Sequence, residues 1–253
     1  MWGLSIHLDM KIDLNCDMGE GMHTDAEIMP FISSANIACG GHAGNASTIL
    51  QTIQLAKKYN VAVGGHPSYP DRDNFGRVEM YLSAEEIYNE VHHQTALIKQ
   101  IANKEGLALH HVKPHGALYN TAAKHEIIAK SIADAILAID ASLKVYGLPS
   151  SVFEKVCKDA GLDFIGEGFA DRTYTNEGTL TPRNLPNALI TEKSQSIEQV
   201  MKMITQGKIK TTSGTSISMD IKTICIHGDG EHAVEFAQHI HDTLINNGIL
   251  ITH

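Results

Sequence analysis

Histidines that follow short apolar runs are the first residues in this sequence that could do chemistry. The chain has fifteen histidines among 253 residues, and five of them come just after a predicted strand: His42, His66, His115, His227 and His232. The carboxyl ends of parallel strands meet at one edge of a sheet or barrel, where α/β proteins place their active sites. A single histidine is more often structural, but the group together indicates a functional site.

The residues around His115 show how a strand can bring polar groups to such an edge. An apolar run from Leu109 stops at Lys113, and Pro114 follows. Because proline has no N–H to donate to a strand ladder, the chain must leave the sheet there. A lysine that closes a buried strand is poorly explained by solubility, and its ammonium could hold a substrate carboxylate or phosphoryl group. We therefore predict that Lys113 and His115 belong to the site.

Carboxylates also come at strand ends, at Asp17, Glu20, Asp171, Asp229 and Glu231. A desolvated carboxylate beside another charge can have its pKa moved toward neutrality and can act as general base to a water molecule. Most of these groups could instead cap helices or pair with arginines, an equally good explanation for Glu20 and Glu231. Asp17 and Asp171 are the stronger candidates for the base.

Two further features could bind an anion. Arg172 and Arg183 have the planar guanidinium that suits a carboxylate or a phosphoryl group. The segment His227, Gly228, Asp229, Gly230 lies between a strand and a helix. Its glycines suggest a helix N-terminus that binds a small anion or a metal-bridged phosphate, whereas Asp229 argues against a dinucleotide site. The sequence contains neither a P-loop nor a G-x-S-x-G motif.

A divalent metal is a less favoured alternative. Asp17 with His42 and His66, or with His115, would be acceptable ligands. The sequence has no H-x-x-x-H or H-x-E spacing to support such a site.

Strands alternate with helices along the chain, and no repeat of fixed period appears. We expect strands at the start of 12–21 and at 34–39, 61–65, 109–113, 144–148, 164–167 and 223–227. Helices are expected at 25–32, 47–59 (capped by Ser47), 83–104 (with a capping box at Ser83), 124–139, 150–160, 196–206 and 231–247. Long polar loops fall at 68–81 and 168–183, and 211–218 has little periodicity. Seven strands favour an irregular α/β barrel over an open sheet. Residues 11–253 form one predicted domain, after an N-terminal extension at 1–10.

Composition narrows the class of protein. The net charge is −9 and the pI is near 5.9, and basic runs are short. These values argue against nucleic acid or a membrane as partner. The four cysteines lack a C-x-x-C pair and read as small packing residues. With no signal peptide or apolar stretch of membrane-spanning length, we expect a soluble cytoplasmic protein.

With these residues in view, the chain resembles the LamB/YcsF family, and the match extends from Lys11 nearly to the C-terminus. The matching motifs are 11–15 with Asp17, Gly19, Glu20 and Gly21; 34–40 with 42–44; 66–68 with 70–72 and 74–77; 111–116 with 118–120; 169–172 with Tyr174; Pro182 and Arg183; and 227–233. Several are long and uninterrupted, so the resemblance is specific.

The resemblance implies a seven-stranded β/α barrel similar to the glycoside hydrolase/deacetylase superfamily. It also implies ATP-dependent opening of the lactam of 5-oxo-L-proline to L-glutamate, in a multi-subunit 5-oxoprolinase with partner subunits B and C. Which subunit binds the ATP is left open.

We assign roles on that basis. Asp17 or Asp171 would activate water, and Lys113 with His42, His66 and His115 would stabilise the oxyanion or protonate the leaving nitrogen. Arg172 or Arg183 would hold the substrate. The alternatives are a metal-dependent amide or sugar deacetylase and a non-catalytic substrate-binding subunit.

Overall fold

A computed structural model describes residues 10–228 and 232–253 of the chain. The predicted anion-binding residues Asp229 and Gly230, the candidate carboxylate Glu231 and residues 1–9 of the expected N-terminal extension lie outside these ranges.

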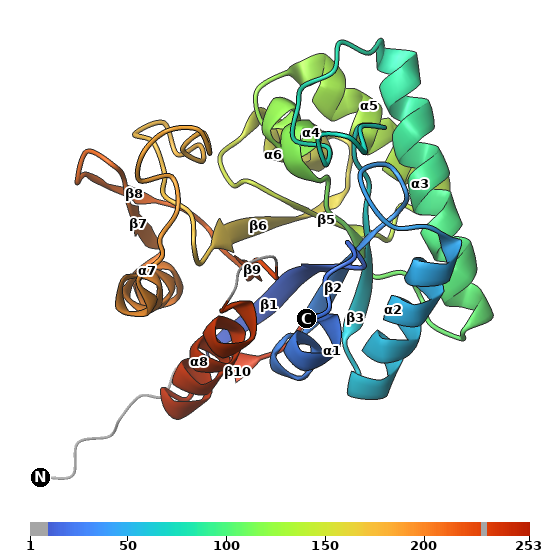
Figure 1. Cartoon of the computed structure of the whole chain (residues 1–253). Helices are drawn as coiled ribbons and strands as arrows, with labels where there is room; N and C mark the ends of the chain where they lie inside the picture. The colour runs from blue at the N-terminus through green and yellow to red at the C-terminus, as the bar shows by residue number, and fades with distance from the viewer. Residues whose placement is uncertain (1–9, 229–231) are drawn as a thin grey trace, which may run out of the picture.

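The described residues form a closed barrel of seven parallel strands, as predicted (Figure 1). In barrel order the strands are β1 (Lys11–Met18), β2 (Ser34–Ala38), β3 (Ala62–His66), β4 (His111–Val112), β5 (Lys144–Gly147), β6 (Asp163–Phe169) and β9 (Thr223–Ile226). Strand β9 pairs with both β6 and β1, and these pairings close the barrel. The short strand β10 (Leu250–Ile251) pairs with the beginning of β1, at Lys11 and Ile12. All seven carboxyl ends therefore open on the same side.

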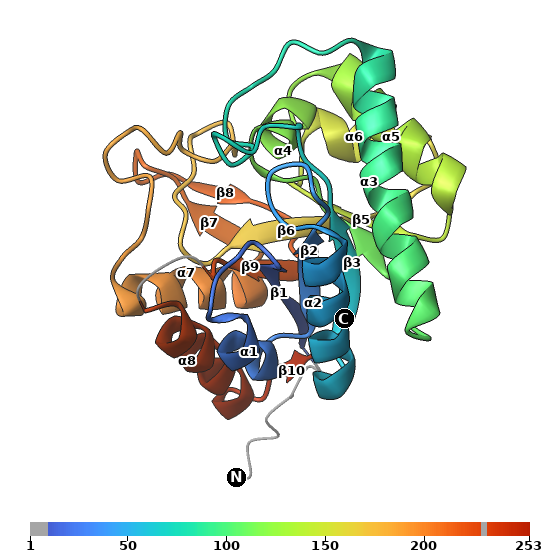
Figure 2. The same cartoon turned by 45° about the vertical axis from the view of Figure 1, so that its right-hand side comes forward.

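Helices surround the outside of this barrel (Figures 1 and 2). They are α1 (Asp25–Ile28), followed by a 3-10 turn at Met29–Phe31, α2 (Ala46–Tyr59), α3 (Ala84–Lys104), α4 (Gly116–Ala122), α5 (Glu126–Ile139), α6 (Val152–Asp159), α7 (Lys193–Gln206) and α8 (Ala233–Asn246). Helices α3 and α5 pack along each other. No helix in the described ranges is both long and apolar enough to cross a membrane.

Besides the additional strand β10, three details differ from the sequence-based expectation. Helix α2 is capped by Asn45 rather than Ser47, because the Asn45 side chain accepts hydrogen bonds from the N–H groups of Ser47 and Thr48. Helix α4 was not expected, since its N-cap residue His115 makes no side-chain capping bond that would mark the start. The 211–218 region contributes to an antiparallel hairpin of β7 (Lys208–Lys210) and β8 (Ser216–Ser218) outside the barrel.

Alternation along β1 explains how the barrel acquires a polar interior. Side chains of successive strand residues point to opposite faces. Four alternate residues, Ile12, Leu14, Cys16 and Met18, belong to the hydrophobic core. The residues between them, Asp13, Asn15 and Asp17, make their side-chain contacts with polar groups of other strands.

These contacts form a polar column inside the barrel. Asp13 accepts hydrogen bonds from Ser33, Ser34 and Thr223 at 2.6–2.7 Å. Above it, Asn15 accepts a hydrogen bond from Asn36 at 2.7 Å. Buried polar groups are costly unless they are paired, so this network fixes the interior faces of the strands. Asp17 stands at the top of the column, at the open end of the barrel.

Candidate functional site

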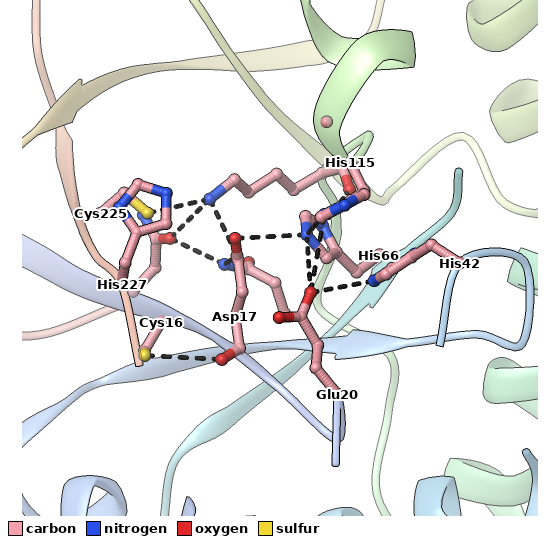
Figure 3. Close-up of polar contacts among 12 residues, drawn as sticks. Cys16, Asp17, Glu20, His42, His66, His115, Cys225 and His227 are labelled. Carbon is pink, nitrogen blue, oxygen red and sulfur yellow. Dashed lines mark hydrogen bonds and ion pairs between the residues drawn. The ribbon is translucent and has the colours of Figure 1, made fainter. Parts of the chain in front are cut away.

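A cavity of about 450 Å³ opens at the carboxyl ends of the barrel strands. Its wall includes nine of the predicted site residues: Asp17, Glu20, His66, Lys113, His115, Arg172, Arg183, His227 and Gly228. They come from segments far apart in the sequence, as expected if the carboxyl ends of the parallel strands meet at one edge of the barrel. Figure 3 shows the central group, with the side chains directed toward one another.

Lys113 lies at the centre of the site and is almost fully buried. Its Nζ lies 3.0 Å from Asp17 Oδ1 and 2.8 Å from Glu167 Oε1. Burial by itself would lower the pKa of Lys113, but the two carboxylates outweigh it and hold the pKa well above its usual value. Lys113 is therefore a fixed ammonium ion inside the barrel mouth.

Asp17 is the carboxylate that links Lys113 to the histidines. Its Oδ1 accepts hydrogen bonds from Lys113 Nζ and, at 2.8 Å, from Asn36 Nδ2. Its Oδ2 lies 3.3 Å from His66 Nε2. Burial raises the pKa of Asp17, but His66 and Lys113 more than compensate and hold the pKa well below its usual range. Asp17 is thus ionised while facing the cavity, and its pKa is shifted away from neutrality, opposite to the direction considered from the sequence.

Three histidines and Glu20 form a second cluster beside Asp17, which we call the histidine cluster: Glu20, His42, His66 and His115 (Figure 3). Glu20 Oε1 lies 2.9 Å from His42 Nε2 and 3.6 Å from His115 Nδ1. His115 Nδ1 lies 2.9 Å from His66 Nε2. Burial lowers the pKa of His42 to about 3 and that of His115 well below its usual value, so both rings are neutral.

The long polar loop at 68–81 holds this cluster in place. The carbonyl oxygen of Phe75 lies 2.9 Å from His115 Nε2, and the neighbouring Gly76 has φ +63°. A Cβ on Gly76 would lie 2.9 Å from His42 Cβ and 3.0 Å from His115 Cδ2. Glycine is needed because no larger residue fits between the loop and the rings. The loop therefore has a structural task at the site.

Asp171 and His227 form a pair on the opposite side of the cavity. His227 Nδ1 lies 2.8 Å from both oxygens of Asp171, and its Nε2 lies 3.2 Å from Arg183 Nη2. Burial would lower the pKa of His227, but the Asp171 carboxylate outweighs it and raises the pKa. Unlike Asp17, Asp171 is not part of the cavity wall. It orients His227, which does face the cavity.

Cations are concentrated at this cavity although the chain is acidic overall. Arg77, Lys113, Lys124, Arg172 and Arg183 all belong to its wall. Arg172 is buried and donates hydrogen bonds to the carbonyl oxygens of Ala188 and Thr181, so part of its guanidinium is used to hold the 168–183 loop. Arg183 is exposed. This charge favours an anionic ligand.

The structure brings most of the predicted site together, with two residues set back. Neither lines the cavity: His42 contacts the wall residue Glu20, and Asp171 contacts the wall residue His227. His232 is only the N-cap residue of α8. Three residues that the structure places at the site were not predicted as site residues from the sequence: Glu167, Asn36 and Arg77. The signal for Glu167 was available, because it is a carboxylate between two glycines on a buried strand.

Comparison with known proteins identifies the family. The model of the LamB/YcsF family matches residues 12–253. The chain belongs to the LamB/YcsF family. It is 48% identical over 246 residues to the 5-oxoprolinase A subunit of Tolumonas auensis, and the match covers 95% of this chain and 98% of that protein.

Solved structures show the same fold. The crystal structure of the lactam utilization protein from Thermus thermophilus superposes with a TM-score of 0.91 at 40% identity, covering 96% of this chain and 99% of that one. The peptidoglycan deacetylase PdaC from Bacillus subtilis gives a TM-score of 0.52 at 14% identity, covering 97% of this chain and 88% of that one. The likeness to PdaC concerns the barrel fold alone.

Proposed function

We propose that this chain is the subunit of a multi-subunit 5-oxoprolinase in which the lactam ring of 5-oxo-L-proline is opened to L-glutamate. The observation that carries the proposal is the ionised Asp17 beside the Lys113 ammonium, facing a cavity lined by cations. The Tolumonas auensis relative is named for 5-oxoprolinase, and the Thermus thermophilus protein is named for lactam utilization. Both names support a lactam as substrate.

The reaction needs a base, an oxyanion partner and an acid. Water adds to the lactam carbonyl carbon, the ring C–N bond breaks, and the nitrogen takes a proton and becomes the amino group of glutamate. Asp17 is the better candidate for the base, because it faces the cavity whereas both oxygens of Asp171 contact His227. Lys113 would stabilise the negative charge on the lactam oxygen and on a phosphoryl group attached to it.

The groups on the two sides of Asp17 have complementary tasks in this proposal. His227, oriented by Asp171, would deliver the proton to the ring nitrogen, and the histidine cluster would position the lactam oxygen. Arg183, with Arg172 behind it, would hold the substrate carboxylate. The cavity of about 450 Å³ leaves ample room for a five-membered lactam that carries an additional phosphoryl group.

ATP enters the proposal through the chemistry of the amide. A lactam is a poor electrophile, so we propose that the complex, with subunits B and C as partners, activates it by transferring the γ-phosphoryl group of ATP to the amide oxygen, and ADP leaves. Water addition and cleavage of the ring C–N bond then give an acyl phosphate, which a second water molecule hydrolyses to L-glutamate and inorganic phosphate. The sequence has no P-loop. The cationic wall offers this chain a way to hold a phosphoryl group without binding the whole nucleotide.

Reconstitution tests this proposal. Glutamate release from 5-oxoproline and ATP is measured with this chain alone, with subunits B and C alone, and with all three, each with and without a chelator. We expect glutamate only from the complete mixture. Full activity of B and C alone would show that the ring opens elsewhere. Chelator-sensitive hydrolysis of a simple acetamide by this chain, without glutamate release, would support a deacetylase instead.

A further inference from the structure

We propose that the histidine cluster is a binding site for one divalent transition metal ion of the zinc type, with His66 Nε2, His115 Nδ1, Glu20 Oε1 and His42 Nε2 as ligands. The site lies in the same cavity as the proposed ring opening but stands on its own geometry, because it is inferred from the direction in which the ring nitrogens point (Figure 3).

Backbone carbonyl groups fix the tautomers of two of the rings. His66 Nδ1 lies 2.7 Å from the carbonyl oxygen of Lys113, and His115 Nε2 lies 2.9 Å from that of Phe75. A carbonyl oxygen can only accept, so each of these nitrogens must carry the hydrogen. The opposite nitrogens, His66 Nε2 and His115 Nδ1, are then the ring atoms that could bind a metal ion. A carbonyl behind each imidazole, with the opposite nitrogen free, is the usual arrangement of metal-binding histidines.

These two nitrogens point at each other, with 2.9 Å between His66 Nε2 and His115 Nδ1. A contact this short needs a cation shared by the two nitrogens, either a proton or a metal ion. His66 Nε2 also faces Asp17 Oδ2 at 3.3 Å and Glu20 Oε1 at 4.0 Å. One added proton on His66 would satisfy a single one of these acceptors, whereas a metal ion would satisfy several at once.

The donor atoms have separations that a small metal ion requires. All four lie within 4.8 Å of one another, and the contacts that link them run from 2.9 to 4.0 Å. Ligands about 2.0–2.1 Å from a tetrahedral zinc ion lie about 3.3 Å apart, in the middle of this range. Three imidazoles and one carboxylate form a ligand set that suits zinc and its neighbours rather than calcium or magnesium.

A second group of potential ligands, Asp17, Cys225 and His227, is less suitable. Lys113 Nζ lies 3.0 Å from Asp17 Oδ1 and 3.1 Å from Cys225 Sγ, so an ammonium ion already occupies the space between them. Burial also raises the pKa of Cys225 well above its usual value, which disfavours the thiolate that a metal binds. The barrel mouth thus has a lysine on one side of Asp17 and a place for a metal on the other.

His66, His115 and Glu20 belong to the cavity wall, so an ion held by them would be open to a ligand from the cavity. A bound metal of this type can polarise a carbonyl oxygen or lower the pKa of a water molecule.

Metal binding to the isolated chain tests the proposal directly. The protein is stripped with chelator and titrated with Co²⁺, followed by its visible absorption, and zinc affinity is obtained by competition. The same titrations are made with His66→Gln, His115→Gln and Glu20→Gln, and with His93→Gln, an exposed histidine on α3, as matched control. Circular dichroism verifies that each variant is folded.

We expect one metal ion per chain and a rise in the unfolding temperature when it binds. Loss of a residue that only hydrogen-bonds to a metal ligand weakens metal affinity by roughly 10- to 100-fold. Each variant that removes a ligand itself should weaken metal affinity by more than that. His93→Gln should bind as the unmodified chain does. Absence of binding by the unmodified chain, or equal affinity in folded His66→Gln and His115→Gln, would overturn the proposal and favour a proton shared between the two rings. Because no substrate is used, this result is independent of glutamate release.

Discussion

Replacement of Lys113 by methionine is the perturbation whose consequence follows most directly from the structure. The substitution keeps the length of the side chain and removes the ammonium ion that lies within 3.0 Å of Asp17 and 2.8 Å of Glu167. The partly buried Asp17 and the fully buried Glu167 then lose the cation that they share. Removal of one partner of a buried ion pair costs about 3–5 kcal/mol. For a chain of this length, that corresponds to a fall of roughly 6–20 °C in the unfolding temperature.

The loss of stability in Lys113→Met should depend on pH through the ionisation of Asp17. In the unmodified protein the pKa of Asp17 is held below its usual value, so its ionisation stabilises the fold above about pH 4, and that stability is lost as the pH falls. In Lys113→Met the pKa of Asp17 should rise, because His66 alone then opposes the effect of burial without the help of the ammonium ion. The variant should then lose stability as the pH rises. The difference between the two proteins is therefore largest at neutral pH and shrinks in acid.

Urea unfolding, followed by circular dichroism at pH 5 and pH 7, measures this difference. The double variant Lys113→Met, Asp17→Asn is the control, since it removes one of the two carboxylates and should recover part of the stability. A Lys113→Met protein as stable as the unmodified chain at pH 7 would refute the reasoning, because the carboxylates would then not depend on Lys113.

Three further predictions concern the supports of the site. Gly76→Ala should lower the free energy of unfolding in urea by about 1–3 kcal/mol and weaken the histidine cluster. Gly106→Ala is the control, because Gly106 has φ +77° and no atom within 4 Å of an added Cβ, so this variant should show the backbone cost alone. Equal losses in the two variants would contradict the claim that a Cβ at position 76 collides with His42 and His115. Asp171→Asn should lower the pKa of His227, because the carboxylate that raises it is removed. The limb of the pH profile of glutamate release that depends on the protonated His227 ring should then shift to lower pH. An unshifted profile would show that His227 does not deliver the proton. Asn45→Ala should cost about 1 kcal/mol of unfolding free energy through the lost cap of α2, while Ser47→Ala should cost less, and the reverse order would restore Ser47 as the cap.

The sequence predicted the barrel because its strands carry a strong signal. Each is a buried run that ends in glycine, proline or a polar residue, and Lys113 followed by Pro114 marks such an end in the chain itself. The elements that were missed have weak signals. Strand β10 has two residues, too few to show a period of two, and α4 begins at Gly116 with φ +55° and without a capping side chain.

The site was predictable as a set of residues but not as a set of contacts. Asp17 lies near the end of β1 and Asp171 just after β6, and the sequence gives no means of knowing that Asp171 contacts His227 while Asp17 faces the cavity. The polar residues of β1 alternate with its core residues, so the alternation that places Asp17 inside the barrel is visible in the sequence. The partner of Asp17 on β2, Asn36, depends on the strand register, and so does Glu167 on β6, which contacts Lys113.

Glutamate release by Asp17→Asn in the complete mixture with subunits B and C tests the central claim most directly. The asparagine keeps the size of the side chain and removes its capacity to take a proton. We predict a rate about 10²- to 10⁴-fold lower, with 5-oxoproline binding retained, and a smaller loss for Asp171→Asn. Full activity of both variants would contradict the assignment of a carboxylate as the base that activates water.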